Sequence, residues 1–125
     1  MPGARALRLF AGRVAFTSAV IFAPVTATAA ELLVLEKAGC PYCVRFEAEV
    51  GRIYDRTAEG RRAPLRRLDN EAPFPEAYRF VAPDRITPTF VLVDGGREIA
   101  RLRGYPGEDF FYGALGVMLE KLPGS

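Results

Sequence analysis

Short apolar runs separated by turn residues predict four β-strands. Residues 31–36 contain four consecutive apolar side chains, a pattern typical of a buried strand. A second, shorter strand is predicted at 64–68, where two arginines suit the edge of a sheet. The third strand spans 89–93, and the turn sequence Asp-Gly-Gly at 94–96 leads into a fourth strand at 98–103. An Asp-Gly turn between two such runs is a strong β-hairpin signal.

The spacing of apolar residues after the first strand predicts an amphipathic helix that begins at Cys40. Its apolar side chains recur at about every 3.6 residues, and they are Cys43, Phe46, Val50, Ile53 and Tyr54. Pro41 suits the first turn, because a residue at that position needs no N–H for a helical hydrogen bond. We therefore expect Cys40 to cap this helix.

The remaining segments predict a linker and two more helices. The polar stretch 57–63 contains a glycine and is expected to be the linker, and a short helix is predicted at 75–81. One face of the last helix carries Phe111, Leu115, Met118 and Leu122. The residues Phe90, Phe110, Phe111 and Tyr112 are expected in the core. The resulting element order is β-α-β-α-β-β-α.

Composition limits the classes of function that this chain can have. It has 125 residues, half of them hydrophobic and about a quarter charged, so one folded domain is expected. No histidine is present, which excludes Ser-His-Asp hydrolysis and imidazole metal sites. Without the three arginines of residues 1–29, 14 basic residues stand against 15 acidic ones. That balance argues against nucleic-acid binding, which needs a concentrated basic surface.

The first 29 residues are typical of a secretory signal peptide. Arginines precede an apolar run at 14–25, and the small-x-small sequence at 27–29 suits a signal peptidase. A membrane-spanning helix needs roughly 20 apolar residues, so cleavage is favoured over an uncleaved anchor. Residues 30–125 are then the mature domain. We expect it outside the cytoplasm, in an oxidising compartment such as the periplasm.

Cys40 and Cys43 are the only cysteines, and their Cys-Pro-Tyr-Cys spacing at a helix start is that of a redox-active pair. The helix N-terminus stabilises an anion, so Cys40 is predicted to be the exposed, reactive thiolate. Cys43, one turn further on, is predicted to be the resolving thiol. Two other interpretations remain open: a structural disulfide, or a copper(I) site using the same two thiolates.

Two motifs and the element order together resemble the thioredoxin superfamily. The sequence Gly39 to Cys43 follows a strand, and the sequence Thr87 to Phe90 places a proline just before a strand. Cys-Pro-Tyr-Cys is similar to a glutaredoxin active site. With the predicted signal peptide, the chain resembles the small periplasmic thioredoxins encoded with bacterial sulfur-oxidation (Sox) systems. The resemblance implies an α/β, thioredoxin-like fold with a four-stranded mixed sheet flanked by helices.

The resemblance also implies roles for individual residues. Cys40 attacks a partner disulfide, Cys43 resolves the complex, and Pro88 is a cis-proline packed against the pair. No metal or other cofactor is needed besides the Cys40–Cys43 disulfide. The residues implied to contact a bound partner are Pro41, Tyr42, Thr87, Pro88, Gly104 and Tyr105.

The sequence departs from the thioredoxin pattern near the cysteines. Gly39 replaces the tryptophan before the first cysteine, and Val34 replaces a buried aspartate. Proton transfer to and from Cys43 therefore needs another group. Glu36 is one candidate, and a solvated acid at the end of a strand is the other interpretation of this residue.

These features predict an exported thiol-disulfide oxidoreductase. We expect a monomer that reduces disulfides or modified cysteines of periplasmic proteins, including a sulfur-carrier protein of a sulfur-oxidation system. A membrane thiol-reductant donor would supply its electrons. The alternatives are a disulfide isomerase, a glutathione-linked enzyme or a copper(I) module.

Overall fold

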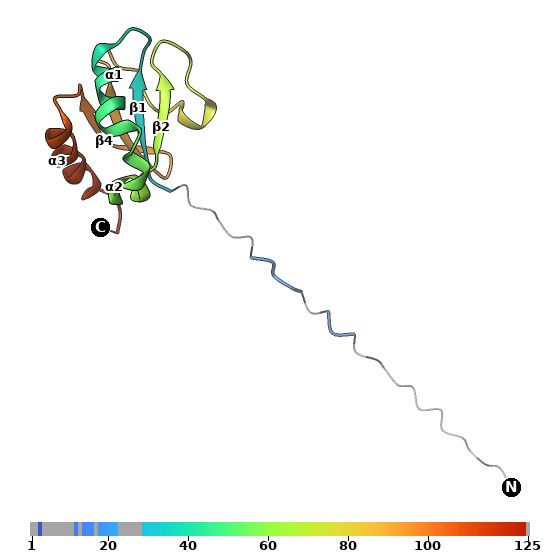
Figure 1. The fold of residues 1–125 in the computed structure, drawn as a ribbon. Coiled ribbons are helices and arrows are strands. Elements are labelled where there is room, and N and C mark those ends of the chain that lie inside the picture. The colour runs from blue at the N-terminus through green and yellow to red at the C-terminus, as the bar shows by residue number, and fades with distance from the viewer. Residues whose placement is uncertain (1–2, 4–11, 13, 17, 23–28, 125) are drawn as a thin grey trace.

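The computed structural model describes residues 3, 12, 14–16, 18–22 and 29–124, so the predicted signal peptide lies largely outside the described residues (Figure 1). Four strands form one sheet in the order β2-β1-β3-β4. They are β1 (Glu31–Glu36), β2 (Leu65–Asp69), β3 (Thr89–Asp94) and β4 (Arg97–Arg103). β2 is parallel to β1, and the other pairs are antiparallel. The predicted mixed sheet is confirmed.

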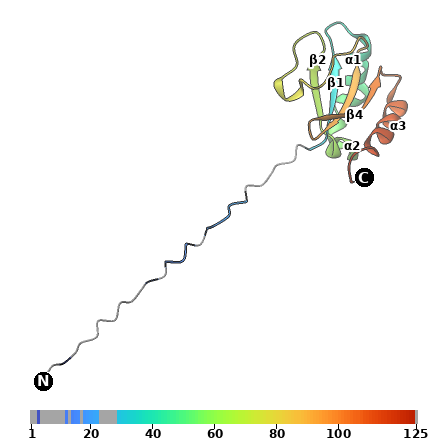
Figure 2. The ribbon, with the colours of Figure 1, turned by 180° about the vertical axis from the view of Figure 1, so that it is seen from behind.

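Alternating side chains of the two central strands fill a core on each face of the sheet. Val34 and Phe90 are paired across β1 and β3 and face the helices. Leu33 and Val91 pair in the same register and face the other side, where the segment 70–81 covers them instead of a long helix (Figure 2). Burial on both faces explains the unbroken apolar runs in these strands.

The helices border the sheet on the Val34 side, and they begin with α1 (Pro41–Phe46). A π-helical turn, η1 (Glu47–Gly51), and a 3-10 turn, η2 (Tyr54–Arg56), continue α1 and replace the single regular helix that the sequence predicts. The last helix is α3 (Glu108–Leu119). Among the described residues, no helix is both long and apolar enough to cross a lipid bilayer.

Two sequence predictions are wrong: the linker at 57–63, between β1 and β2, and the helix at 75–81, before β3. Instead of a linker, the structure has a short helix, α2 (Ala58–Arg62), because the Thr57 hydroxyl caps it by accepting a hydrogen bond from the Gly60 N–H at 2.9 Å. Gly60 is required there, since a Cβ atom would lie 2.0 Å from the Tyr54 carbonyl oxygen. In place of the helix at 75–81 stands only a 3-10 turn, η3 (Glu76–Tyr78).

Candidate active site

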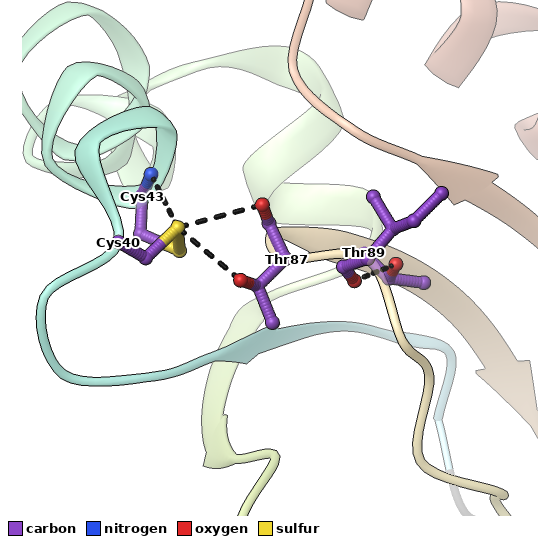
Figure 3. Close-up of a disulfide and its surroundings, with 5 residues drawn as sticks. Cys40, Cys43, Thr87 and Thr89 are labelled. Carbon is purple, nitrogen blue, oxygen red and sulfur yellow. Dashed lines mark hydrogen bonds between the residues drawn. A yellow bond between two sulfur atoms is a disulfide. The ribbon is translucent and has the colours of Figure 1, made fainter.

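The cysteine pair lies at the start of α1, directly after β1. Cys40 is the N-cap residue, and its Sγ accepts a hydrogen bond from the Cys43 backbone N–H at 3.2 Å. Pro41 occupies the first helical turn, as predicted. The two cysteines form a disulfide, with their Cα atoms 5.3 Å apart (Figure 3). In the reduced protein the same N–H would stabilise a Cys40 thiolate, because a helix start favours an anion.

A cis peptide bond joins Thr87 to Pro88 and brings Thr87 against the cysteines. The Thr87 hydroxyl donates to Cys40 Sγ at 3.3 Å, and the Thr87 carbonyl oxygen lies 3.4 Å from the same sulfur (Figure 3). The cis geometry expected from the resemblance is therefore present. A hydroxyl donor favours the thiolate form of Cys40 over the thiol.

The expectation that Cys40 is the exposed sulfur is wrong for this structure. Cys40 is 3% exposed and Cys43 is 7% exposed. Thr87 covers Cys40 from the side of the cis bond, which sequence spacing alone does not show. The assignment of Cys40 as the attacking thiol remains a prediction, and its support is the position of this sulfur between the helix start and Thr87.

An apolar groove of about 450 Å³ begins beside Thr87 and brings together several of the predicted contact residues. Its lining consists of Tyr42, Ile86, Thr87, Leu102, Arg103, Gly104, Tyr105, Pro106 and Phe110. Gly104 has a φ of 83°, and its N–H donates to the Pro88 carbonyl at 2.8 Å. A side chain would be strained at that φ, so glycine is needed to bring this loop against the cis-proline.

Two aromatic residues of the groove differ from expectation. Phe110, predicted in the core, is 60% exposed, because the buried face of α3 is set by Phe111 and Leu115, about one quarter turn away. Tyr105 is buried and its hydroxyl donates to Glu49 at 2.5 Å, so only part of it borders the groove. That hydrogen bond joins the Gly104 loop to the helical segment after the cysteines, where Glu49 also forms an ion pair with Arg45.

A second cleft, of about 510 Å³, reaches the disulfide from the β2 side. It is lined by both cysteines and by Glu36, Lys37, Glu47, Arg67 and Asp69, among others. An ion pair of 2.6 Å between Arg67 and Glu47 crosses from β2 to η1. Burial raises the pKa of the Glu36 carboxyl, although the nearby Arg67 guanidinium opposes that effect. Glu36 is therefore half-buried beside the cysteines and is not the freely solvated acid of the alternative interpretation.

The raised pKa of Glu36 predicts a pH-dependent stability effect of Glu36→Gln. When the folded-state pKa of a carboxyl exceeds its unfolded value, stability falls as pH rises from the unfolded pKa through the folded one. The amide removes this cost, so we expect Glu36→Gln to have a higher free energy of unfolding than wild type at pH 7. The advantage should vanish near pH 4, as measured by denaturant unfolding at both pH values.

Glu76→Gln is the matched control, because it removes the same charge from an exposed position on η3. An equal gain from both substitutions would show that net charge, and not the burial of Glu36, is responsible.

Comparison with known proteins places this fold and site in a family. A model of the thioredoxin-like domain matches residues 26–116, and the chain belongs to that family. Its cysteine pair makes it a thiol-disulfide oxidoreductase, a class whose chemistry uses the two cysteines without a separate cofactor. In the part of the chain that the structure describes, no three His, Cys, Asp or Glu side chains are grouped to hold a metal ion.

The solved structures similar to this chain include two thioredoxins. The periplasmic thioredoxin SoxS from Paracoccus pantotrophus, in its reduced form, has 44% sequence identity and a TM-score of 0.70. That match covers 74% of this chain and 97% of the SoxS chain. The thioredoxin Mala s 13 of Malassezia sympodialis has 18% sequence identity and a TM-score of 0.57. That match covers 72% of this chain and 77% of the Mala s 13 chain, and it supports the fold alone. A comparison with curated proteins gave no match.

Proposed function

We propose that this protein is an exported thiol-disulfide reductase that acts on partner proteins in the periplasm. The observation that carries the proposal is the 44% identity to a periplasmic thioredoxin over nearly that protein's whole length. The Cys-Pro-Tyr-Cys motif after the predicted signal peptide supports the same conclusion. A cysteine-bearing sulfur-carrier protein is the partner that best fits the likeness to SoxS.

The proposed reaction uses the two sulfurs in turn. The Cys40 thiolate attacks one sulfur of the partner disulfide, forms a mixed disulfide and releases the second partner sulfur as a thiolate. Cys43 then loses its proton and attacks Cys40 Sγ, which frees the first partner sulfur and closes the Cys40–Cys43 bond. Two electrons pass to the partner, and a membrane thiol-reductant donor would restore the dithiol.

The groove beside Thr87 is where the partner chain is proposed to lie. Tyr42 and Phe110 expose large aromatic surface there, at 59% and 60%. Exposed aromatic surface in a groove beside Thr87, the residue that contacts Cys40, favours contact with a polypeptide over contact with a small polar thiol. Protein disulfides are therefore the favoured substrates over a glutathione-linked reaction.

One experiment tests export and the direction of electron flow together. Periplasmic and membrane fractions are acid-quenched, then denatured and labelled with a maleimide at neutral pH, and the intact mass of the natural protein is measured. We expect a chain that starts near Ala30 or Glu31 and carries two maleimide groups, because a reductase is held as the dithiol. A species with Met1 in the membrane fraction would contradict export and cleavage.

An unlabelled, disulfide-bonded protein in the same sample would instead indicate an oxidant. The copper(I) alternative is tested separately by metal analysis of the reduced protein purified without oxygen. One copper ion per chain in that sample would favour the copper alternative.

A further inference from the structure

The segment that carries Thr87 and Pro88 is held by a buried carboxylate three residues before Thr87. The Asp84 side chain is 10% exposed and forms hydrogen bonds through both oxygens. Its Oδ1 accepts from the Ile86 backbone N–H at 3.1 Å. Its Oδ2 accepts from Arg101 Nη1 at 3.1 Å and from Arg103 Nε at 2.7 Å. One carboxylate therefore joins this segment to two arginines of β4.

The backbone of Asp84 is held from the other side by Asn70, which follows β2. The Asn70 side chain accepts from the Asp84 N–H at 2.9 Å and donates to the Asp84 carbonyl at 2.6 Å. Arg101 adds a hydrogen bond of 3.0 Å from Nη2 to the Ala82 carbonyl. The segment is thus fixed to β4 and to the residue that follows β2, and these two strands are the outer strands of the sheet.

A short chain of contacts leads from Asp84 to the reactive sulfur. The Asp84 carboxylate holds the N–H of Ile86, and the Ile86 carbonyl accepts from the Thr89 hydroxyl at 2.6 Å (Figure 3). Between them stands Thr87, whose hydroxyl and carbonyl face Cys40 Sγ. Both hydrogen bonds are made by Ile86, so the backbone that leads into Thr87 is held by Asp84 through the Ile86 N–H and by Thr89 through the Ile86 carbonyl.

We propose that Asp84 is a positioning residue for the thiol-disulfide reaction, because it fixes the backbone edge at Thr87 along which a partner chain must lie to reach Cys40. The proposal rests on the oxidoreductase activity of the Cys40–Cys43 pair. Burial opposes ionisation of Asp84, but the Ile86 N–H and the two arginines outweigh it and lower the pKa of this carboxyl. The Asp84 carboxylate is therefore charged at neutral pH and accepts hydrogen bonds through both of its oxygens.

The test compares two reactions of reduced Cys40 in Asp84→Asn. A protein disulfide must align along Thr87, whereas iodoacetamide needs only the thiolate. Both rates are measured at a pH above the thiolate transition of each variant, so that differences in ionisation do not enter. We expect the rate with the protein disulfide to fall by about tenfold, because small displacements of a reacting geometry have effects of this order. The alkylation rate should stay within about twofold of wild type.

Glu98→Gln is the matched control, because Glu98 is the other carboxylate bound to Arg101, at 2.6 Å, and forms no hydrogen bond with residues 82–87. It removes the same charge, and both of its rates should match wild type. The proposal would be overturned if both rates of Asp84→Asn were unchanged or if both fell equally. It would also be overturned if Glu98→Gln lost its rate with the protein disulfide and kept its alkylation rate.

Circular dichroism establishes whether Asp84→Asn is folded. If it is not, Asn70→Ala replaces it, since Asn70 holds the same residue from the turn after β2. In Asn70→Ala too, the rate with the protein disulfide must fall while the alkylation rate stays near wild type. A wild-type protein that reduces no protein disulfide would instead contradict the oxidoreductase activity itself, which keeps the two failures distinct.

Discussion

Cys40→Ser is expected to reduce the rate of protein-disulfide reduction by at least about a thousandfold, to the level of the uncatalysed reaction, because it removes the nucleophile. A serine hydroxyl is not ionised at neutral pH and cannot form a mixed disulfide. The helix start and the Thr87 hydroxyl, which surround this sulfur, would then have no thiolate to stabilise. The measurement is the steady-state reduction of a protein disulfide with dithiothreitol as the electron donor.

Thr89→Ser is a suitable control, because it keeps the hydroxyl that bonds to the Ile86 carbonyl and changes one methyl group near the site. It should retain activity within a few-fold of wild type. Residual activity of Cys40→Ser above one tenth of wild type would show that another group attacks the substrate.

Phe111→Ala is expected to lower the free energy of unfolding by about 3–5 kcal/mol, the usual range for removing a buried phenylalanine ring. Phe111 is fully buried on α3, and its ring lies 4.8 Å from Phe90 and 5.4 Å from Phe46, measured between centroids. It therefore joins the last helix to both β3 and α1. Urea unfolding followed by circular dichroism measures the change.

The adjacent Phe110→Ala is the control, since that ring is mostly exposed and surface substitutions usually change stability by less than about 0.5 kcal/mol. Phe110→Ala should instead weaken the reaction with protein disulfides, because the ring lines the groove beside Thr87. Equal destabilisation by the two substitutions would contradict the assignment of Phe111 to the core.

Elements with a strong local signal could be predicted from the sequence. The unbroken apolar run gives β1 its bounds at Glu31–Glu36, and the Asp-Gly turn correctly predicts the β3–β4 hairpin. Cys40 at the N-cap and Pro41 in the first turn also follow from local rules. For these residues the local preference and the folded structure agree, which is why the active-site motif could be located.

Features that depend on contacts between distant segments could not be predicted in the same way. Cys40 is hydrogen-bonded to Thr87, which is 47 residues away in the chain. The contacts of Asp84 with Arg101 and Arg103 likewise exist only once β4 is in place. The α2 helix is a different case, because its N-cap residue Thr57 is a local signal that the linker prediction did not include.

The most direct test of the central claim is an intact-mass measurement of the covalent complex formed with a disulfide-bonded protein. Reduced Cys43→Ser and Cys40→Ser are each mixed with that substrate, quenched in acid and digested to map the joined peptides. We predict that Cys43→Ser accumulates a complex linked through Cys40 and that Cys40→Ser accumulates none. A complex formed through Cys43 in the Cys40→Ser protein, equal in amount to that of Cys43→Ser, would contradict this prediction.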